Sequence, residues 1–327
     1  WRDWSSDVCS SDLSIATTSV NLGDVNLEWF ANNNRHPRIP QNMFRFKDGR
    51  LDQIGMSWCK DGFCALQLNE CGSCQPAGSG CPQVLGPGCS DPYSDSLNGQ
   101  QSGLAPRWQC NAATGWFQYP PQNLPGAAPT VGRRLQVLQA DLAVNGATLY
   151  CDSFYLLPQD YEDGNMLNNA SFKRVDRGTL NSSGYRLNPT GPTTIGKPAI
   201  FAWENHSNTV VINPVDIPND GRVFVASDVV DNGDGTFRYD YAIYNLTSDY
   251  NVNGFAVPVP AGLDVTDIEF RDVSNDSGGP YATTDWTSGV VDGHVVWNTE
   301  EYSQNNDANA IRWGTMYNFS FTVNAEP

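Results

Sequence analysis

The chain has 327 residues, with 36 acidic and 19 basic side chains and a formal net charge of −17. This negative charge argues against a nucleic-acid partner, because the phosphates of DNA or RNA would be repelled. No apolar run approaches the ~18 residues of a membrane span. Short runs of aromatic and β-branched residues, separated by Gly, Pro, Asn and Asp, indicate an all-β protein.

Residues 1–13 have neither helical nor strand periodicity and do not begin with Met. They resemble a translated sequencing adapter, so we expect them to be an artefact that lies outside the fold, as a fusion scar would. The true N-terminus, with any signal peptide, would then be missing from this sequence.

Residues 14–187 are predicted to form a Cys-rich β domain. Val25, Leu27 and Trp29 alternate as in a short strand, and residues 47–50, Lys-Asp-Gly-Arg, are typical of a hairpin turn. Residues 69–106 contain few apolar side chains and many Gly, Pro, Ser and Cys. So long an irregular stretch in a compact domain is usually functional or cross-linked.

Eight cysteines after residue 13, most of them closely spaced, predict disulfides and an oxidising compartment. The sequence does not choose among the pairings, although Cys59 and Cys64 flank a Lys-Asp-Gly turn that a disulfide would tie together. A four-thiolate zinc site is the alternative, but its second pair is spaced more widely than in a zinc knuckle. The disulfide candidates are Cys59, Cys64, Cys71, Cys74, Cys81, Cys89, Cys110 and Cys151.

Residues 188–198 are rich in Pro, Gly and Thr and are predicted to be a linker. Residues 14–187 hold 13 basic and 14 acidic side chains, whereas residues 199–327 hold 4 basic and 19 acidic side chains. Nearly all the excess charge therefore lies in the C-terminal part, which fits a soluble domain in a medium with salt or divalent cations.

Residues 199–327 are predicted to form an acidic antiparallel β-sandwich, because about nine short strand-like runs follow one another at near-regular spacing. The hairpin of residues 222–246 is the clearest, since apolar side chains alternate from Phe237 to Ile243 after Asn-Gly and Asp-Gly turn residues. The runs are predicted to begin near residues 200, 210, 223, 237, 255, 265, 286, 295 and 311.

Two sets of residues carry a resemblance. Residues 239–249 and 255–260 are similar to the hairpins of immunoglobulin-like sandwich domains on bacterial secreted proteins. A second set resembles a family of uncharacterised secreted bacterial all-β proteins over most of the chain beyond residue 20, which implies export but carries over no activity and no catalytic residue. That set is His-Pro at 36–37, Gln-Asn at 41–42, Ile-Gly-Met-Ser-Trp at 54–58, Cys-Ser-Asp-Pro-Tyr-Ser at 89–94, Leu-Asn-Gly at 97–99, Arg-Arg-Leu-Gln-Val at 133–137 and Arg-Trp-Gly-Thr-Met-Tyr-Asn at 312–318.

A basic cluster surrounds His36 in this otherwise acidic chain. One interpretation is an anion-binding site made by Arg35, Arg38 and Arg45, with His36 as a catalytic acid or base. The alternative is a set of arginines that pair with nearby Asp side chains or with the acidic second domain.

Other candidate sites depend on carboxylates and aromatic rings. Asp91 and Asp95 are further catalytic candidates, because a glycosidase needs two carboxylates across a cleft, although their spacing does not select them. The acidic loop with Asp160, Glu162 and Asp163 is the candidate calcium site, and no other cofactor is expected. A sugar-stacking platform or, more commonly, core packing is the expectation for Trp29, Trp58, Trp108 and Trp116.

The sequence favours a secreted or cell-surface, disulfide-bonded bacterial protein that binds or scaffolds, with an extracellular polysaccharide or a surface protein as partner. The alternative is a secreted hydrolase of polysaccharide with a catalytic N-terminal domain, so whether the chain is an enzyme stays open. Two carboxylates facing each other across a cleft would favour the enzyme.

Overall fold

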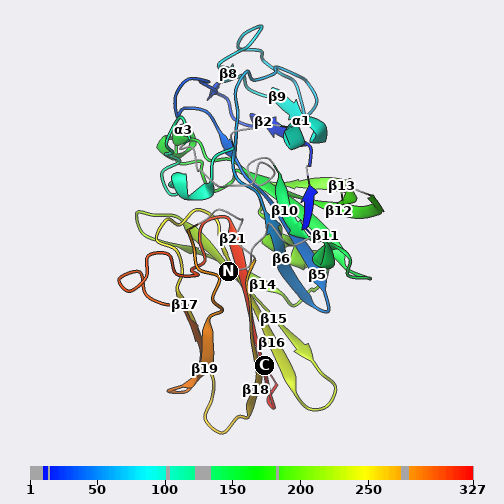
Figure 1. Cartoon of the computed structure of the whole chain (residues 1–327), viewed down its shortest axis with the longest axis vertical. Helices are drawn as coiled ribbons and strands as arrows, with labels where there is room; N and C mark the ends of the chain where they lie inside the picture. Colours follow the sequence, from blue (N-terminus) through cyan, green and yellow to red (C-terminus); the bar gives the residue numbers. More distant parts are fainter. Residues whose placement is uncertain are drawn as a thin grey trace.

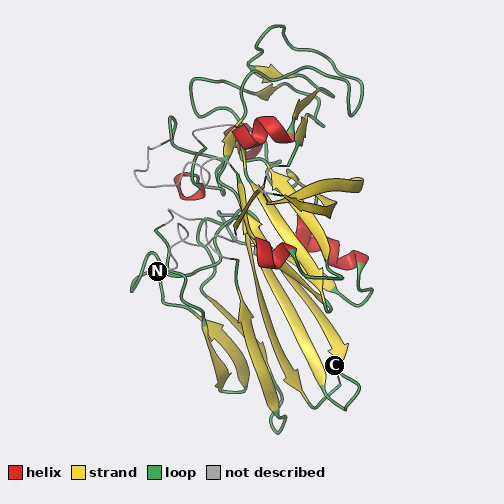
Figure 2. Cartoon of the chain, turned by 45° about the vertical axis from the view of Figure 1, so that its right-hand side comes forward, coloured by secondary structure: helices red, strands yellow, loops and turns green. Residues whose placement is uncertain are grey.

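The computed structural model describes residues 10–13, 15–100, 104–121, 134–181, 184–273 and 280–326. Strands dominate this part of the chain and its helices are short (Figure 2), which confirms the prediction of an all-β protein. From top to bottom, Figure 1 shows Cys-rich loops, a seven-stranded sheet and two smaller sheets. No helix among the described residues is long and apolar enough to cross a membrane.

The seven-stranded sheet forms the middle of the molecule, and its neighbouring strands are antiparallel. The predicted turn at residues 47–50 joins β5 to β6, with Asp48 and Gly49 at positive φ. The helix α2 (Gln139–Leu142) follows β10 directly. In spatial order the strands are β1 (Ser10–Leu13), β10 (Leu135–Leu138), β6 (Arg50–Met56), β5 (Gln41–Lys47), β11 (Thr148–Phe154), β12 (Ala170–Asn181) and β13 (Gly184–Ile195).

Two predicted boundaries of this region are corrected. The end of the segment expected to lie outside the fold forms β1, which pairs with β10 and buries Leu13, while residues 1–9 lie outside the described part. Most of the predicted linker, residues 188–198, belongs to β13, which pairs with β12. The prolines of this stretch are tolerated because β13 is an edge strand, where a missing N–H costs no ladder hydrogen bond.

The pairings among the described residues of the Cys-rich loops are two-stranded. Their small hydrophobic cluster consists of Trp29, Ala65, Leu85 and Cys89. The pairs are β2 (Thr17–Val20) with β9 (Ser90–Tyr93), β3 (Leu27–Glu28) with β8 (Val84–Leu85) and β4 (Arg38–Ile39) with β7 (Lys60–Asp61). The short helices nearby are α1 (Asp95–Gln100), η1 (Arg107–Gln109) and α3 (Pro158–Glu162).

Two antiparallel sheets at the bottom of Figure 1 form the predicted sandwich. Rings from both sheets fill the space between them: Trp297 of the smaller sheet contacts Phe319 of the larger one. The larger sheet has the order β14 (Val211–Asp216), β15 (Arg222–Asp231), β16 (Phe237–Asn245), β21 (Thr315–Val323) and β18 (Val265–Arg271). The smaller has the order β17 (Gly254–Pro258), β20 (His294–Asn298) and β19 (Thr287–Val291).

The predicted hairpin of residues 222–246 is confirmed as β15 and β16, which pair from Val223 with Asn245 to Asp231 with Phe237. Gly233 and Gly235 in its turn have φ of +77° and +89°, where a side chain would strain the backbone. In contrast, the strand expected near residue 200 is the 3-10 helix η2 (Ala199–Asn205). A short apolar run does not distinguish a buried helix from a buried strand by its periodicity.

The two parts of the chain share one hydrophobic core. It contains Phe44 and Tyr150 from the seven-stranded sheet, Trp203 from η2, and Tyr244 and Met316 from the sandwich. Both faces of β21 are therefore buried, one against the smaller sheet and the other against the N-terminal part. The predicted charge boundary near residue 199 does not separate two independent cores.

Candidate functional site

Two disulfides cross-link the Cys-rich loops, Cys64–Cys81 and Cys74–Cys89. The prediction of disulfides is confirmed for these cysteines, which are consequently not thiolate ligands of a zinc site. Cys64 pairs with Cys81 rather than with Cys59. The other candidates, Cys59, Cys71, Cys110 and Cys151, carry free thiols, so half of the eight are paired.

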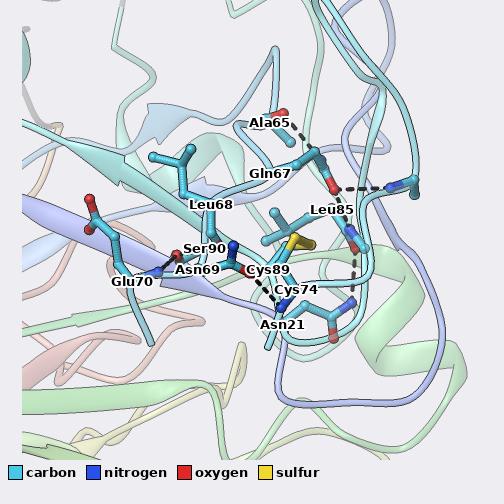
Figure 3. Close-up of a disulfide and its surroundings, with 12 residues drawn as sticks. Asn21, Ala65, Gln67, Leu68, Asn69, Glu70, Cys74, Leu85, Cys89 and Ser90 are labelled. Atoms are coloured by element: carbon cyan, nitrogen blue, oxygen red, sulfur yellow. Dashed lines mark hydrogen bonds between the residues drawn. A yellow bond between two sulfur atoms is a disulfide. The ribbon is translucent and has the colours of Figure 1, made fainter. Parts of the chain in front are cut away.

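Side-chain amides hold the loops around the Cys74–Cys89 disulfide (Figure 3). Gln67 donates to the carbonyls of Ala65 and Val84, and Asn21 donates to the carbonyl of Leu85 at 2.9 Å. The N–H of Cys74 donates to the side chain of Asn69 at 2.8 Å. These bonds satisfy backbone groups that a larger sheet would otherwise pair.

His36 is buried rather than placed at an open site, with 1% of its surface exposed. Its Nδ1 bonds the carbonyl of Phe30 at 3.0 Å, and its Nε2 lies 3.2 Å from Asp61. The rings of Phe117 and Tyr119 pack edge-on against the imidazole. This enclosure leaves no room for a substrate beside the ring, so we do not propose His36 as a catalytic acid or base.

The three arginines near His36 are paired with carboxylates of the N-terminal part. Arg35 bonds Glu28 and Glu162, the second through two nitrogens at 2.9 and 2.8 Å. The buried guanidinium of Arg38 lies 2.8 Å from Asp61 and over the Phe117 ring. Arg45 lies 3.2 Å from Asp52 and 2.9 Å from Asp141. The structure thus does not bring them together around an anion.

The carboxylates Asp91 and Asp95 are held separately. Asp91, in β9, accepts a hydrogen bond from the N–H of Leu66, whereas Asp95 is exposed at the start of α1 and accepts from the N–H of Ser96. Burial raises the pKa of Asp91, and the nearby charge of Lys60 opposes that shift. The arrangement is not the facing pair that a glycosidase requires.

Lys60, which sequence reasoning did not single out, has an unusual environment. Its ammonium donates to Thr17 Oγ1 at 2.8 Å and to Asn98 Oδ1 at 2.7 Å, and lies over the Tyr93 ring. Burial lowers the pKa of Lys60 to about 7, against a smaller opposing effect of Asp91. An amine whose pKa lies near 7 and that contacts a hydroxyl is a candidate general base.

The calcium candidates do not converge on one point. Asp160 is buried and accepts from Asn169 at 2.9 Å, and burial raises its pKa to about 6. Glu162 is exposed and bound by Arg35, and Asp163 is exposed beyond α3. Within the described ranges, no three His, Cys, Asp or Glu side chains are grouped so that they could hold a metal ion.

A cavity of about 80 Å³ lies where η1 of the N-terminal part meets loops of the sandwich. The ring of Tyr281 meets that of Trp108 edge-on at 6.1 Å, and the guanidinium of Arg312 lies 3.3 Å from the centre of the Tyr281 ring. The residues that line it are Met56, Arg107, Trp108, Cys110, Asp249, Asn251, Tyr281, Arg312, Trp313 and Thr315.

Arg107 lines this cavity and connects the two parts of the chain by hydrogen bonds. Its guanidinium donates to the carbonyls of Ser57, Gln41 and Gly314 and to the side chain of Asn42, at 2.7 to 2.9 Å. A Cβ at Gly314 would lie 2.6 Å from Nη1 of Arg107, so the close approach requires glycine.

The loop at the mouth of the cavity is held by a buried carboxylate. Asp220 accepts hydrogen bonds from the Ser248 hydroxyl and from the N–H groups of Asp249 and Tyr250. Burial raises the pKa of Asp249, and its proximity to Asp220 adds to that shift. Asn111 donates to the Asp249 carboxylate at 2.9 Å. The loop is therefore ordered before any ligand arrives.

Two exposed rings belong to the loops beside this cavity. Tyr250 is 73% exposed and adjoins Asp249 in the chain. Trp116 is 53% exposed, and its carbonyl accepts from the N–H of Asn111, whose side chain bonds Asp249. Large exposed rings beside a hollow are typical of ligand-binding surfaces.

Sequence reasoning named Trp108 and Trp116 for stacking but missed Asp249, Tyr281 and Arg312. The only signal for Arg312 was its place in the motif at residues 312–318. The contact of η1 with the sandwich loops, which lie far along the chain, is a tertiary feature that no local spacing reveals. Comparison of the chain with models of protein families, with curated proteins and with solved structures gave no match.

Proposed function

We propose that this chain is a secreted bacterial binding protein whose ligand site is the cavity between η1 and the sandwich loops. The observation that carries the proposal is the combination of aromatic rings, Trp108 and Tyr281, with the polar side chains of Asp249 and Asn251 around one hollow. Concave sites with apolar rings and a few oriented polar groups are the usual form of a ligand site.

A saccharide is the ligand class that suits these groups best. Its C–H faces pack on aromatic rings, and its hydroxyls exchange hydrogen bonds with carboxylates and amides. The cavity, at about 80 Å³, is smaller than the ~150 Å³ of an engineered cavity that holds benzene. We therefore expect a chain end or one edge of a sugar to enter it, with neighbouring sugars on Trp116 and Tyr250.

Binding fits this cavity better than hydrolysis does. Asp249 is the one carboxylate among the lining residues that the structure describes. A glycosidase needs two, set apart by a fixed distance across the scissile bond. The two disulfides support secretion, because such bonds persist in oxidising compartments. The paired antiparallel sheets support placing the C-terminal part in the immunoglobulin-like class.

The test is a panel of soluble neutral and acidic polysaccharides, screened by affinity gel electrophoresis with the full chain. We expect at least one to retard the protein, and Tyr250→Ala and Trp116→Ala each to weaken binding about fivefold, since each ring contributes on the order of 1 kcal/mol. Phe63→Ala, an exposed ring in the Cys-rich loops, is the matched control. No retardation by any member, or equal loss with Phe63→Ala, would contradict the proposal.

A hydrolase with its site in the N-terminal part is the second candidate, and the Lys60 environment favours it. A neutral Lys60 amine would accept the proton of the Thr17 hydroxyl, 2.8 Å away, and so activate that oxygen as a nucleophile. Turnover of p-nitrophenyl esters or glycosides that is abolished by Lys60→Met and by Thr17→Val would support this candidate. Turnover that is unchanged in both variants would exclude it.

A further inference from the structure

Two cysteines without disulfide partners meet inside the shared core. Cys59 follows β6 and exchanges two backbone hydrogen bonds with Ala105, at 2.8 and 2.9 Å. Cys110 ends η1, and its N–H donates to the carbonyl of Arg107. Because Arg107 also donates to the carbonyl of Ser57 at 2.7 Å, the segments that precede the two cysteines lie side by side.

The side chains of Cys59 and Cys110 are neighbours in the core. Both residues belong to the same buried hydrophobic cluster, and Cys59 is the neighbour that acts most strongly on the Cys110 thiol. Among the described residues, the other cysteines are poor partners for either of them. Cys151 is buried in a different cluster, and Cys71 is exposed in the Cys-rich loops.

A metal site does not explain the contact. Asp61 is near Cys110, but it bonds Arg38 and lies beside His36. No group of three metal-ligating side chains is found in the part of the chain that the structure describes. The pair is thus either two buried thiols or one disulfide.

We propose that Cys59 and Cys110 form a third disulfide in the mature protein. The chain already carries two disulfides, so it folds where thiols are oxidised. This assignment goes beyond the proposed binding function and does not depend on it. It also places a cross-link in the wall of the cavity, because Cys110 lines the cavity and its carbonyl accepts from Trp313 Nε1 at 3.2 Å.

The oxidant is an organic disulfide, either a small molecule or a thiol–disulfide oxidoreductase. The thiolate of one cysteine attacks a sulfur of the oxidant and releases one thiolate, which takes up a proton. The second cysteine then displaces the remaining oxidant thiolate from the mixed disulfide. In total the two cysteines lose two protons and two electrons, and the oxidant is reduced to two thiols.

The surroundings of the pair determine when this exchange takes place. The neighbouring Cys59 thiol, together with burial, holds the pKa of the Cys110 thiol well above its usual value. Since the thiolate is the reactive form, the folded dithiol exchanges slowly. We therefore expect the bond to form during folding, before β6 and η1 close over the pair, and to resist reductants in the native state.

Peptide mapping of the full chain tests the assignment. The protein is made in the bacterial periplasm or refolded with reduced and oxidised glutathione, then unfolded without reductant, alkylated with iodoacetamide and digested. We expect the peptide with Cys59 to be linked to the peptide with Cys110, and the label to appear on the three remaining cysteines, Cys9, Cys71 and Cys151. Label on both Cys59 and Cys110, or a link from either to another cysteine, would overturn the proposal.

Matched variants and a metal measurement sharpen the test. Cys59→Ser is expected to expose Cys110 to alkylation after unfolding, whereas Cys71→Ser should leave the linked peptide intact. A dithiol reductant should cleave this link in denaturant but not in the native protein. One zinc ion per chain in native mass spectrometry, with labelled Cys59 and Cys110, would overturn the disulfide. The map of the unmodified chain decides the question even if a variant fails to fold.

Discussion

The Cys-rich loops and the sandwich are held together by different interactions. The small core of the loops, around Trp29 and Leu85, is supplemented by two disulfides and by the amides of Asn21 and Gln67. The sandwich instead packs rings such as Trp297 and Phe319 between its sheets. This difference shows that a segment with few apolar side chains becomes ordered through cross-links, whereas strands with alternating aromatic residues become ordered by burying their rings.

The largest expected effect is the loss of a ring from the sandwich core. Trp297 is 1% exposed, stacks on Phe255 and donates to the carbonyl of Glu269 at 3.0 Å. We expect Trp297→Ala to lower the free energy of unfolding by ~3–5 kcal/mol, because it removes buried area and leaves a cavity. Urea titration followed by circular dichroism measures the loss. Tyr302→Ala, at a ring 78% exposed, is the control and should change stability little.

Removal of a disulfide should affect the other region. Cys74 and Cys89 are 15 residues apart, and a loop of that length predicts a loss of about 3 kcal/mol on cleavage. We expect Cys74→Ser with Cys89→Ser to speed hydrogen exchange in residues 67–90 while exchange in β15, β16 and β21 stays slow. Cys71→Ser serves as the control, since Cys71 is exposed and unpaired by disulfide. Equal acceleration in the sandwich would show that the regions unfold as one unit.

Arg107 tests how tightly the two regions are coupled. We expect Arg107→Lys to cost about 2–4 kcal/mol, because one ammonium cannot reach the carbonyls of Ser57, Gln41 and Gly314 together and leaves buried acceptors unpaired. Thermal unfolding measured by calorimetry checks this. A single transition at lower temperature would indicate a shared core, and two transitions would indicate that this arginine holds separate units together. A variant as stable as the natural chain would contradict the prediction.

The pH dependence of stability tests Lys60, which lies in β7 and donates to Thr17 and Asn98. Its pKa is about 7 in the fold, against 10.5 for an unperturbed lysine in an unfolded chain, so the unfolded chain binds more protons between these values. The free energy of unfolding should therefore rise with pH from about 7 to 10.5, by on the order of 1–3 kcal/mol from this group. Urea titrations across this range compare the natural chain with Lys60→Met, whose slope should be flatter. Lys197→Met, at a half-exposed lysine, should keep the natural slope.

The smallest expected effect is that of salt. Residues 199–327 hold 4 basic and 19 acidic side chains, and screening shortens from ~8 Å at physiological ionic strength to ~3 Å at 1 M. We expect added NaCl to slow hydrogen exchange in the sandwich, with the free energy of opening raised by less than ~1 kcal/mol. This increase should be larger in the sandwich than in β5 and β6. Calcium chloride at matched ionic strength should add nothing, because Asp228 bonds Thr209 while Asp231 and Asp234 accept bonds within their own turn. A calcium-specific effect would reveal a site.

The sequence alone determined the features that depend on neighbours along the chain. Alternation from Phe237 to Ile243 and the glycines at 233 and 235 sufficed to predict the β15–β16 hairpin, because side-chain period and positive φ are local properties. The Asp48-Gly49 turn followed for the same reason. The clustering of cysteines predicted disulfides, but their pairing depends on which loops meet.

Only the tertiary structure decided the rest. Asn318 is a polar residue between the apolar Tyr317 and Phe319, yet it is buried and donates to the carbonyl of Leu51, because the N-terminal part covers that face of β21. The stretch at 188–198 has a linker composition, but an available neighbour, β12, makes most of it an edge strand. The candidate cavity likewise unites Trp108 with Tyr281 and Arg312, and the proposed disulfide unites Cys59 with Cys110. Such contacts between distant segments arise from the packing of a shared core, which local periodicity does not encode.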